Sequence, residues 1–114
     1  MWVMLSDSFL SIVQDTTNPN NLLVRARRRG DIRAVFPEAQ EKIVKNADYL
    51  VRASIERSLV AARIQTEVLD IDYPNFKDSV KDPVLHFSYS RIWEIMVEMQ
   101  EMTSKQKGAN VWKK

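Results

Sequence analysis

Residues 49–71 read YLVRASIERSLVAARIQTEVLDI, and the spacing of their apolar residues changes partway along. The first part alternates, with one apolar face made of Tyr49, Val51, Ala53 and Ile55. From about Glu56 to Ile71 the apolar residues recur every three or four positions, at Val60, Ile64, Val68 and Ile71. Alternation is typical of a strand with one buried face, and the longer spacing is typical of an amphipathic helix. The segment therefore predicts a strand that leads directly into a helix.

Two hairpins are expected upstream of this helix. Residues 42–45 are separated from the strand at 49–55 by the sequence NAD, which suits a tight turn. Nearer the N-terminus, residues 8–14 and 22–27 are rich in β-forming residues and flank the turn-forming run DTTNPNN. In the later segment one face holds Leu22, Val24 and Ala26, and the other holds Leu23, Arg25 and Arg27. This alternation predicts a sheet with one dry face and one wetter face.

A short helix is expected between the two hairpins. Gly30 ends the strand at 22–27, and Asp31 follows as the expected N-cap of the helix. The apolar residues Ile32 and Val35 have helical spacing, and Pro37 stops the helix after little more than one turn.

The C-terminal part of the chain predicts a longer helix. Asn75 is expected to cap a short turn that runs through Val80. Asp82 and Pro83 then mark the start of a helix that runs to about Thr103, because a carboxylate caps well and proline suits the first helical position. The expected buried stripe of this helix is Leu85, Tyr89, Ile92, Met96 and Met99.

These elements predict the α+β class in the form of a two-layer sandwich. We expect a small, mostly antiparallel sheet of three or four strands, with the short helix and the two longer helices on one face. Residues 1–103 form a single domain in this interpretation, and residues 104–114 form a flexible polar C-terminal tail.

The composition of the chain narrows its function. With no cysteine among its 114 residues, it has no disulfide, thiolate metal site or cysteine nucleophile. Its apolar runs are far shorter than the roughly 20 residues that a membrane span needs, so no membrane partner is expected. The first residues lack the basic leader of a secretory signal, and the expected location is therefore cytoplasmic.

Catalytic and metal-binding residues are not expected. His86 is the only histidine, and Asp82 lies four residues before it, but the carboxylate of Asp82 is already assigned to helix capping. An enzyme that uses His86 is therefore the third hypothesis for function. The acidic residues between the last two helices lack the glycine and glutamate of a calcium loop. With only Gly30 and Gly108, the chain also has no glycine-rich nucleotide loop, so no cofactor is expected.

The stretch LLVRARRRGDIR, residues 22–33, concentrates positive charge. Its five arginines are opposed only by Asp31, whereas the whole chain carries a net charge of +2. Alternation predicts that Arg25, Arg27 and Arg52 lie on the open face of the sheet, and Phe9 would add an aromatic ring to that face. The expected binding surface is made of Phe9, Arg25, Arg27, Arg28, Arg29, Arg33 and Arg52.

Three interpretations of this surface remain open. The preferred one is a small non-catalytic binding domain that uses the arginine-bearing face to contact a protein partner or a second copy of itself, since arginine is enriched in interfaces. The alternative is a single-stranded nucleic-acid-binding protein that uses the same face. In the third, the arginines form a solvated face and pair with Glu38, Asp48 or Glu56.

Three stretches resemble an uncharacterised family of short bacterial proteins. They are MWVMLSDSFLSIVQD and LLVRARRRGDI near the N-terminus and IDYPNFKDSVKDPVLHFSYSRIW in the second half, and the similarity covers most of residues 1–100. The resemblance implies a compact domain of bacterial or mobile-element origin. It carries over no catalytic residue.

Overall fold

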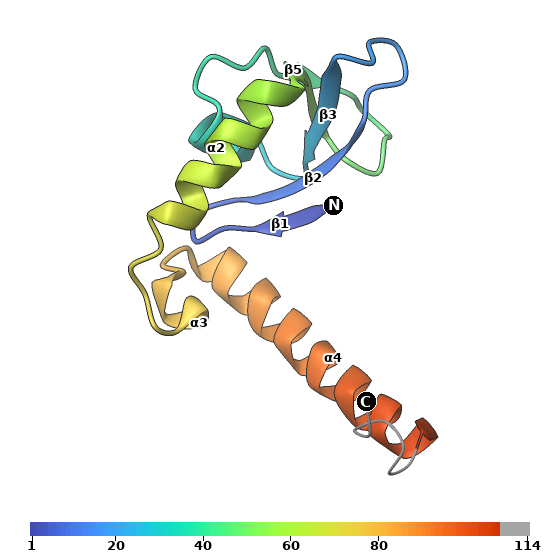
Figure 1. Ribbon diagram of the computed structural model, residues 1–114, viewed down its shortest axis with the longest axis vertical. Helices are drawn as coiled ribbons and strands as arrows, with labels where there is room; N and C mark the ends of the chain where they lie inside the picture. Colours follow the sequence, from blue (N-terminus) through green and yellow to red (C-terminus); the bar gives the residue numbers. More distant parts are fainter. Residues whose placement is uncertain (108–114) are drawn as a thin grey trace.

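The chain begins with three consecutive strands that pair with one another (Figure 1). In the computed structural model, which describes residues 1–107, these are β1 (Trp2–Met4), β2 (Phe9–Gln14) and β3 (Asn21–Ala26). β5 (Val51–Glu56) pairs with β3, and the short β4 (Lys42–Ile43) lies at the outer edge of β5. The sheet therefore has the order β1-β2-β3-β5-β4, and every neighbouring pair is antiparallel.

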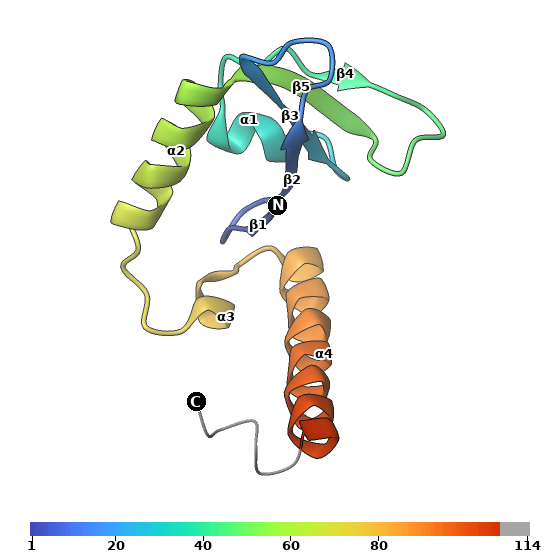
Figure 2. The ribbon, with the colours of Figure 1, turned by 45° about the vertical axis from the view of Figure 1, so that its right-hand side comes forward.

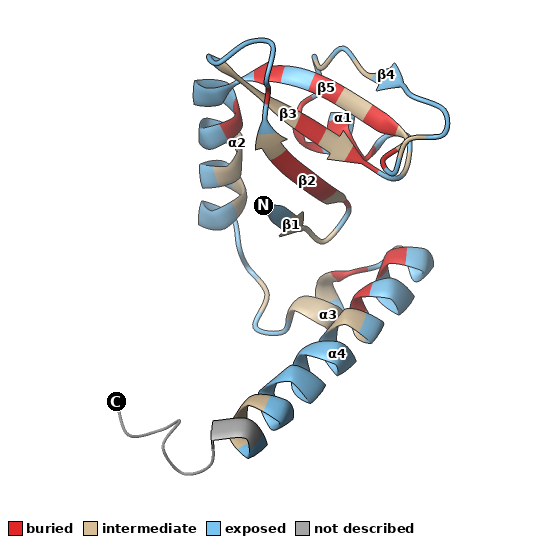
Figure 3. Ribbon diagram, turned by 90° about the vertical axis from the view of Figure 1, so that its right-hand side faces the viewer, coloured by how far each residue is buried: buried red, intermediate tan, exposed pale blue. Residues whose placement is uncertain are grey.

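The main core lies on one face of this sheet. Alternate residues of the central strands are buried there beneath α1 (Asp31–Val35) and α2 (Arg57–Leu69), as Figure 3 shows. The buried residues of this core are Leu10, Ile12, Val24, Ala26, Ile32, Val35, Phe36, Val51, Ala53, Ile55 and Val60. The change of hydrophobic period at the end of β5 thus lets α2 fold back over the strand that precedes it.

A second, smaller core joins the C-terminal helices to the first hairpin. It is made by α3 (Phe76–Ser79), α4 (Pro83–Lys107) and the two strands β1 and β2. Its buried residues are Val80, Leu85 and Tyr89, packed against Met4, Phe9, Phe76 and Ile92. Met4 and Phe9 alternate with residues of the main core, so they face away from α1 and α2. α4 therefore contacts the opposite side of the sheet from α2.

The predicted α+β class is confirmed. Both hairpins form, and β4 and β5 flank the expected turn, where Asn46 has a φ of 67°. The sheet has five strands where three or four were expected, because residues 2–4 form the additional strand β1, which pairs with β2. Only α1 and α2 cover the expected face, and α4 lies outside that layer.

One predicted helix cap is wrong. The N-cap of α1 is Gly30, whose φ of 94° lies in the left-handed region that glycine adopts readily, and Asp31 is the first residue of the helix. The carboxylate of Asp31 is buried and accepts a hydrogen bond from the Phe9 amide at 3.1 Å. Asp31 therefore joins α1 to β2. The predicted cap of α4 is right, since Asp82 accepts from the amides of Val84 and Leu85 at 2.9 and 3.1 Å.

The second half of α4 leaves the rest of the molecule (Figure 2). Met96 and Met99, which were expected in the core, are 50% and 43% exposed, because no other described element covers the helix at that point. The radius of gyration is 16.8 Å, whereas a compact chain of this length has about 13 Å. The helical spacing of these methionines is real, but their burial prediction is wrong.

α4 extends into the segment that was expected to form a flexible C-terminal tail. α4 passes Thr103 and ends at Lys107, so residues 104–107 are helical, and residues 108–114 lie outside the described part of the chain. Among the described residues, no helix combines the length and the apolar character that a membrane crossing requires.

Candidate functional site

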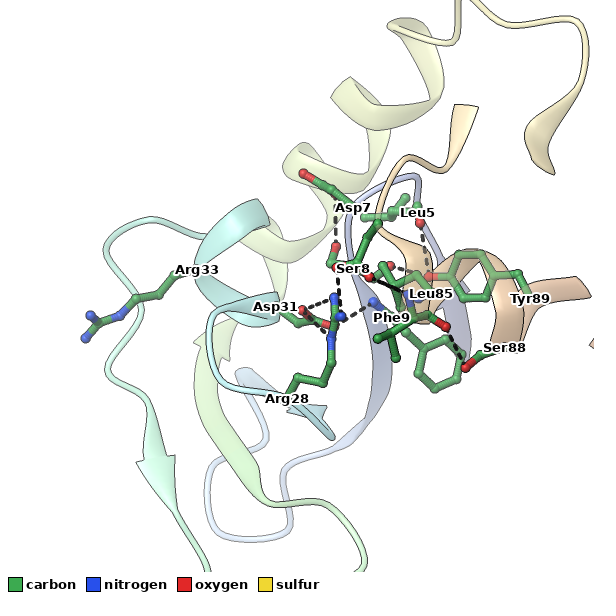
Figure 4. Close-up of polar contacts among 12 residues, drawn as sticks. Leu5, Asp7, Ser8, Phe9, Arg28, Asp31, Arg33, Leu85, Ser88 and Tyr89 are labelled. Carbon is green, nitrogen blue, oxygen red and sulfur yellow. Dashed lines mark hydrogen bonds and ion pairs between the residues drawn. The ribbon is translucent and has the colours of Figure 1, made fainter. Parts of the chain in front are cut away.

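A buried tyrosine holds the first turns of α4 against the turn between β1 and β2. The hydroxyl of Tyr89 donates to the carbonyl oxygens of Ser8 at 2.9 Å and Leu5 at 3.0 Å (Figure 4). Burial raises the pKa of Tyr89 above its ordinary value, so the hydroxyl keeps its proton as a donor. The ring also packs against Phe9 and stacks on Phe76. These contacts fix where α4 starts and which of its faces meets the sheet.

An arginine connects the same helix to α1. The guanidinium group of Arg28 lies 2.9 Å from Asp31 and 2.9 Å from Asp82, so it bridges two carboxylates. The pKa of Asp82 is lowered, first by the hydrogen bond from the Leu85 amide and then by Arg28. The carboxylate of Asp82 therefore has two roles: it caps the first turn of α4, and its ion pair with Arg28 joins that turn to the rest of the domain. Within residues 1–107, these contacts hold the helix at its N-terminal end.

The contacts of Tyr89, Arg28 and Asp82 together form what we call the α4 anchor. Beyond this anchor, α4 presents a continuous row of apolar and small residues to solvent. The row recurs every three or four positions and therefore follows one side of the helix. We call it the α4 stripe, and it consists of Val84, Ser88, Ile92, Ile95, Met99 and Met102. Val84 and Met102 are each 62% exposed, Ile95 is 56% exposed, and Ile92 is half-buried. A stripe of this kind is normally buried against another element.

The first part of the α4 stripe forms one wall of a groove. The groove has a volume of about 500 Å³ and lies between α4 and the β1–β2 hairpin. Trp2, which is 65% exposed, and Phe9 form its opposite wall and contact each other edge to face at 5.7 Å. Arg27, Arg28 and Asp31 lie at its polar end. The groove continues the exposed stripe onto the body of the domain.

The other side of α4 is partly occupied by α3. Lys77 lies 4.2 Å from the centre of the Trp93 ring, and Phe76 packs on Tyr89. A second hollow, of about 460 Å³, is lined by these residues together with Met96. The α4 stripe is therefore the less covered of the two apolar sides of the helix.

Charged residues of α4 avoid the stripe. At about 100° per residue, those between 91 and 105 fall within an arc of about 80°. They are Arg91, Glu94, Glu98, Glu101 and Lys105. Arg91 and Glu98 lie at the border between this arc and the stripe, and Arg91 makes only a long contact of 3.7 Å with Glu94. Among the described residues of α4, the stripe thus has one charged edge and one apolar edge.

The predicted open face of the sheet carries Arg25 and Arg52 directly opposite each other in the register of β3 and β5. Arg25 donates to the Ser11 hydroxyl at 2.8 Å, and its guanidinium carbon lies 4.4 Å from the centre of the Tyr49 ring. Arg27 packs on the same ring at 4.2 Å. Tyr49 is only 4% exposed, so two of the predicted binding arginines serve to bury a tyrosine.

Asp48 accepts hydrogen bonds from two of these arginines, Arg27 and Arg52. Its carboxylate lies 3.1 Å from Arg52, and its carbonyl oxygen accepts from Arg27 at 2.6 Å. This is one of the acidic partners that the solvated-face interpretation named. The Nε atoms of Arg25 and Arg52 are buried without a hydrogen-bond partner among the described residues. The cluster is therefore largely, but not completely, satisfied by the chain itself.

The other predicted site residues lie elsewhere. Arg28 belongs to the α4 anchor, and Phe9 belongs to the groove and the small core. Arg29 and Arg33 are exposed, and the Arg33 side chain points away from that anchor (Figure 4). The seven residues therefore do not form one surface. Arg25, Arg27 and Arg52 come together. Arg27 also lines the groove with Phe9 and Arg28, and Arg29 and Arg33 are exposed just before and within α1.

Two groups were missed by the sequence interpretation. Tyr49 was assigned to the apolar face of its strand, but it lies just before β5 and packs on the arginines instead. The α4 stripe was missed because the neighbouring row that includes Leu85 and Tyr89 has the same helical spacing and predicts the buried side equally well. A signal was present, since Ile95 and Met102 are apolar residues outside that row.

His86 lies on the exposed surface of α4. The nearby Asp82 carboxylate accepts from two amides, as its assignment to helix capping predicted, and it also pairs with Arg28, which the sequence did not suggest. Within residues 1–107, no three acidic or histidine side chains gather closely enough to hold a metal ion.

Comparison of the chain with models of protein families, with curated proteins and with solved structures finds no match. The resemblance to a family of short bacterial proteins therefore stays a prediction.

Proposed function

We propose that this chain is a non-catalytic protein-interaction domain, and that its α4 stripe binds an amphipathic helix of a protein partner. The observation that carries the proposal is a helix anchored at one end, with a continuous apolar row exposed along its length. Pairing with a second helix removes the apolar surface of such a stripe from water, and this pairing is a common mode of recognition.

The chemistry of the stripe supports a helical partner. Ile95, Met99 and Met102 are spaced as anchors for an opposing helix, and methionine adapts its shape to the groove it meets. Trp2 and Phe9 add aromatic surface of the kind that dominates binding energy in interfaces. A cytoplasmic location is part of the proposal and is supported by the absence of cysteine.

Site-specific photo-crosslinking in cells that produce the chain tests this function. A photoreactive amino acid replaces Met99, which lies in the stripe, or Val97, which lies on the opposite side of α4. We expect a covalent protein adduct from position 99 and none from position 97. The absence of an adduct at 99, or equal adducts at both positions, would contradict the proposal.

The arginine-bearing open face is the second candidate. Arg25 and Arg52 lie opposite each other in the strand register, and such a pair of cations favours an anion, such as the backbone of a single-stranded nucleic acid. The contacts of these arginines with Ser11, Asp48 and Tyr49 leave this candidate less support than the α4 stripe has. Binding of single-stranded RNA at two salt concentrations distinguishes the two candidates.

A further inference from the structure

We infer that the partner helix is α4 of a second copy of this chain, aligned antiparallel to the first. This inference rests on the proposed function and names the occupant of the same surface. It is carried by three properties of α4 that suit pairing with itself: the area of its exposed stripe, the position of its one small residue, Ser88, and the position of its edge charges.

The exposed area is what a small dimer needs. Each half-exposed large side chain presents on the order of 100 Å². The α4 stripe together with Trp2 therefore offers roughly 600 Å² per copy, or about 1,200 Å² for two copies. That total is at the lower end of stable protein interfaces. The elongated shape, with a radius of gyration of 16.8 Å, leaves this surface accessible.

The stripe is complementary to itself when the two helices run in opposite directions. If the two-fold axis passes between Ile92 and Ile95, then Ser88 lies opposite Met99 of the second copy. A small residue facing a large one allows the helices to approach closely. The groove beside Ser88 then receives the far end of the partner helix, next to Trp2. The antiparallel arrangement puts the two domains at opposite ends of the pair.

The edge charges select this direction. Arg91 and Glu98 lie on the same edge of the stripe, seven residues apart. In an antiparallel pair the same edges of the two helices face each other, so Arg91 of one copy comes near Glu98 of the other. The two-fold symmetry repeats this contact. In a parallel pair each edge faces the opposite edge, where the described part of α4 has no charged residue between 91 and 105.

Sedimentation of the purified full chain tests the inference. The wild-type chain should reach twice its mass of 13.3 kDa as concentration rises. Met99→Glu should remain monomeric, and Val97→Glu, on the opposite side of α4, should dimerise like the wild type. Both residues are exposed, so the helix content of each variant should match the wild type, which circular dichroism checks.

A charge exchange tests the direction. Arg91→Glu places two glutamates near each other at both edge contacts and should weaken dimerisation by about tenfold. Adding Glu98→Arg to that variant restores opposite charges and should recover the wild-type dissociation constant. Failure of the second change to restore dimerisation would overturn the antiparallel arrangement.

The outcomes separate this inference from the proposed function. A wild-type chain that stays monomeric, while position 99 forms an adduct with a different protein, overturns the second copy as partner and leaves the proposed function standing. A dimer that survives Met99→Glu overturns the inference as well. An absence of any adduct at position 99 overturns the proposed function and, with it, the inference.

Discussion

Arg28 and Asp82 are 54 positions apart in the sequence, and their side chains meet at 2.9 Å. The contact joins the end of the third strand to the cap of the last helix. Through Arg28, the buried Asp31 and the helix cap share one cation. The orientation of α4, and therefore of its exposed stripe, depends on this bridge and on the hydroxyl of Tyr89.

Arg28→Gln should destabilise the protein by about 1–3 kcal/mol, because the buried carboxylate of Asp31 loses its cation. Urea unfolding measures the effect. The control is Arg29→Gln, since Arg29 is exposed and a surface change of this kind stays within about 0.5 kcal/mol. Equal effects of the two substitutions would show that the bridge does not stabilise the fold.

Tyr89→Phe should cost about 1–2 kcal/mol, because the carbonyl oxygens of Leu5 and Ser8 lose the hydroxyl proton that they share while the ring packing remains. Thermal unfolding provides the measurement. Tyr73→Phe is a suitable control, since no hydrogen bond of the Tyr73 hydroxyl is found within the described residues. A melting temperature unchanged by Tyr89→Phe would argue that α4 is anchored in another way.

Acid should weaken the turn between β2 and β3. The hydrogen bond from Ser54, followed by that from the Thr17 amide, lowers the pKa of Asp15 from 3.8 to about 2. A lowered pKa means that the stabilisation is present above the unfolded value of 3.8 and is lost as pH falls towards about 2. Melting curves of the wild type and Asp15→Asn should therefore differ near neutral pH and converge in acid. A difference that grows on acidification would contradict this assignment.

The open-face arginines should stabilise the fold more than they bind nucleic acid. Changing Arg25, Arg27 and Arg52 to glutamine removes two contacts with the Tyr49 ring, each worth about 0.5–1 kcal/mol, and the ion pair with Asp48. We expect a lower melting temperature and no change in affinity for single-stranded RNA. The reverse result, with an intact melting temperature and a salt slope reduced by about 0.7 per lost contact, would favour the nucleic-acid alternative.

The strands and hairpins could be predicted because their signals are local. Alternation in residues 49–55 and the turn residues beside them specify a strand and its direction, and the same holds for residues 22–27. The cap at Asp82 could also be predicted, since an aspartate directly before a proline is a strong start signal for a helix. The cap at Asp31 was not, because the Phe9 amide, which is distant in sequence, and the nearby Arg28 both engage the same carboxylate.

The candidate site could be predicted only in part. Alternation correctly places Arg25 and Arg52 on one face. The packing of Tyr49 on Arg25 depends on the path of the turn before β5, and residue spacing does not predict that path. For α4, helical spacing shows that an apolar side exists and does not show what covers it. Leu85 is covered by the chain itself, whereas Met99, on the same helix, is not.

Hydrogen exchange of α4 at low and high protein concentration tests the central claim most directly. A helix segment of about a dozen residues without tertiary contacts is marginally stable in water, so its amides exchange quickly until a partner covers it. We predict that the amides of residues 95–105 exchange fast in dilute protein and become protected as concentration rises, while those of residues 86–92 are protected throughout. Exchange at residues 95–105 that does not change over a wide range of concentration would contradict the assembly of this chain through α4.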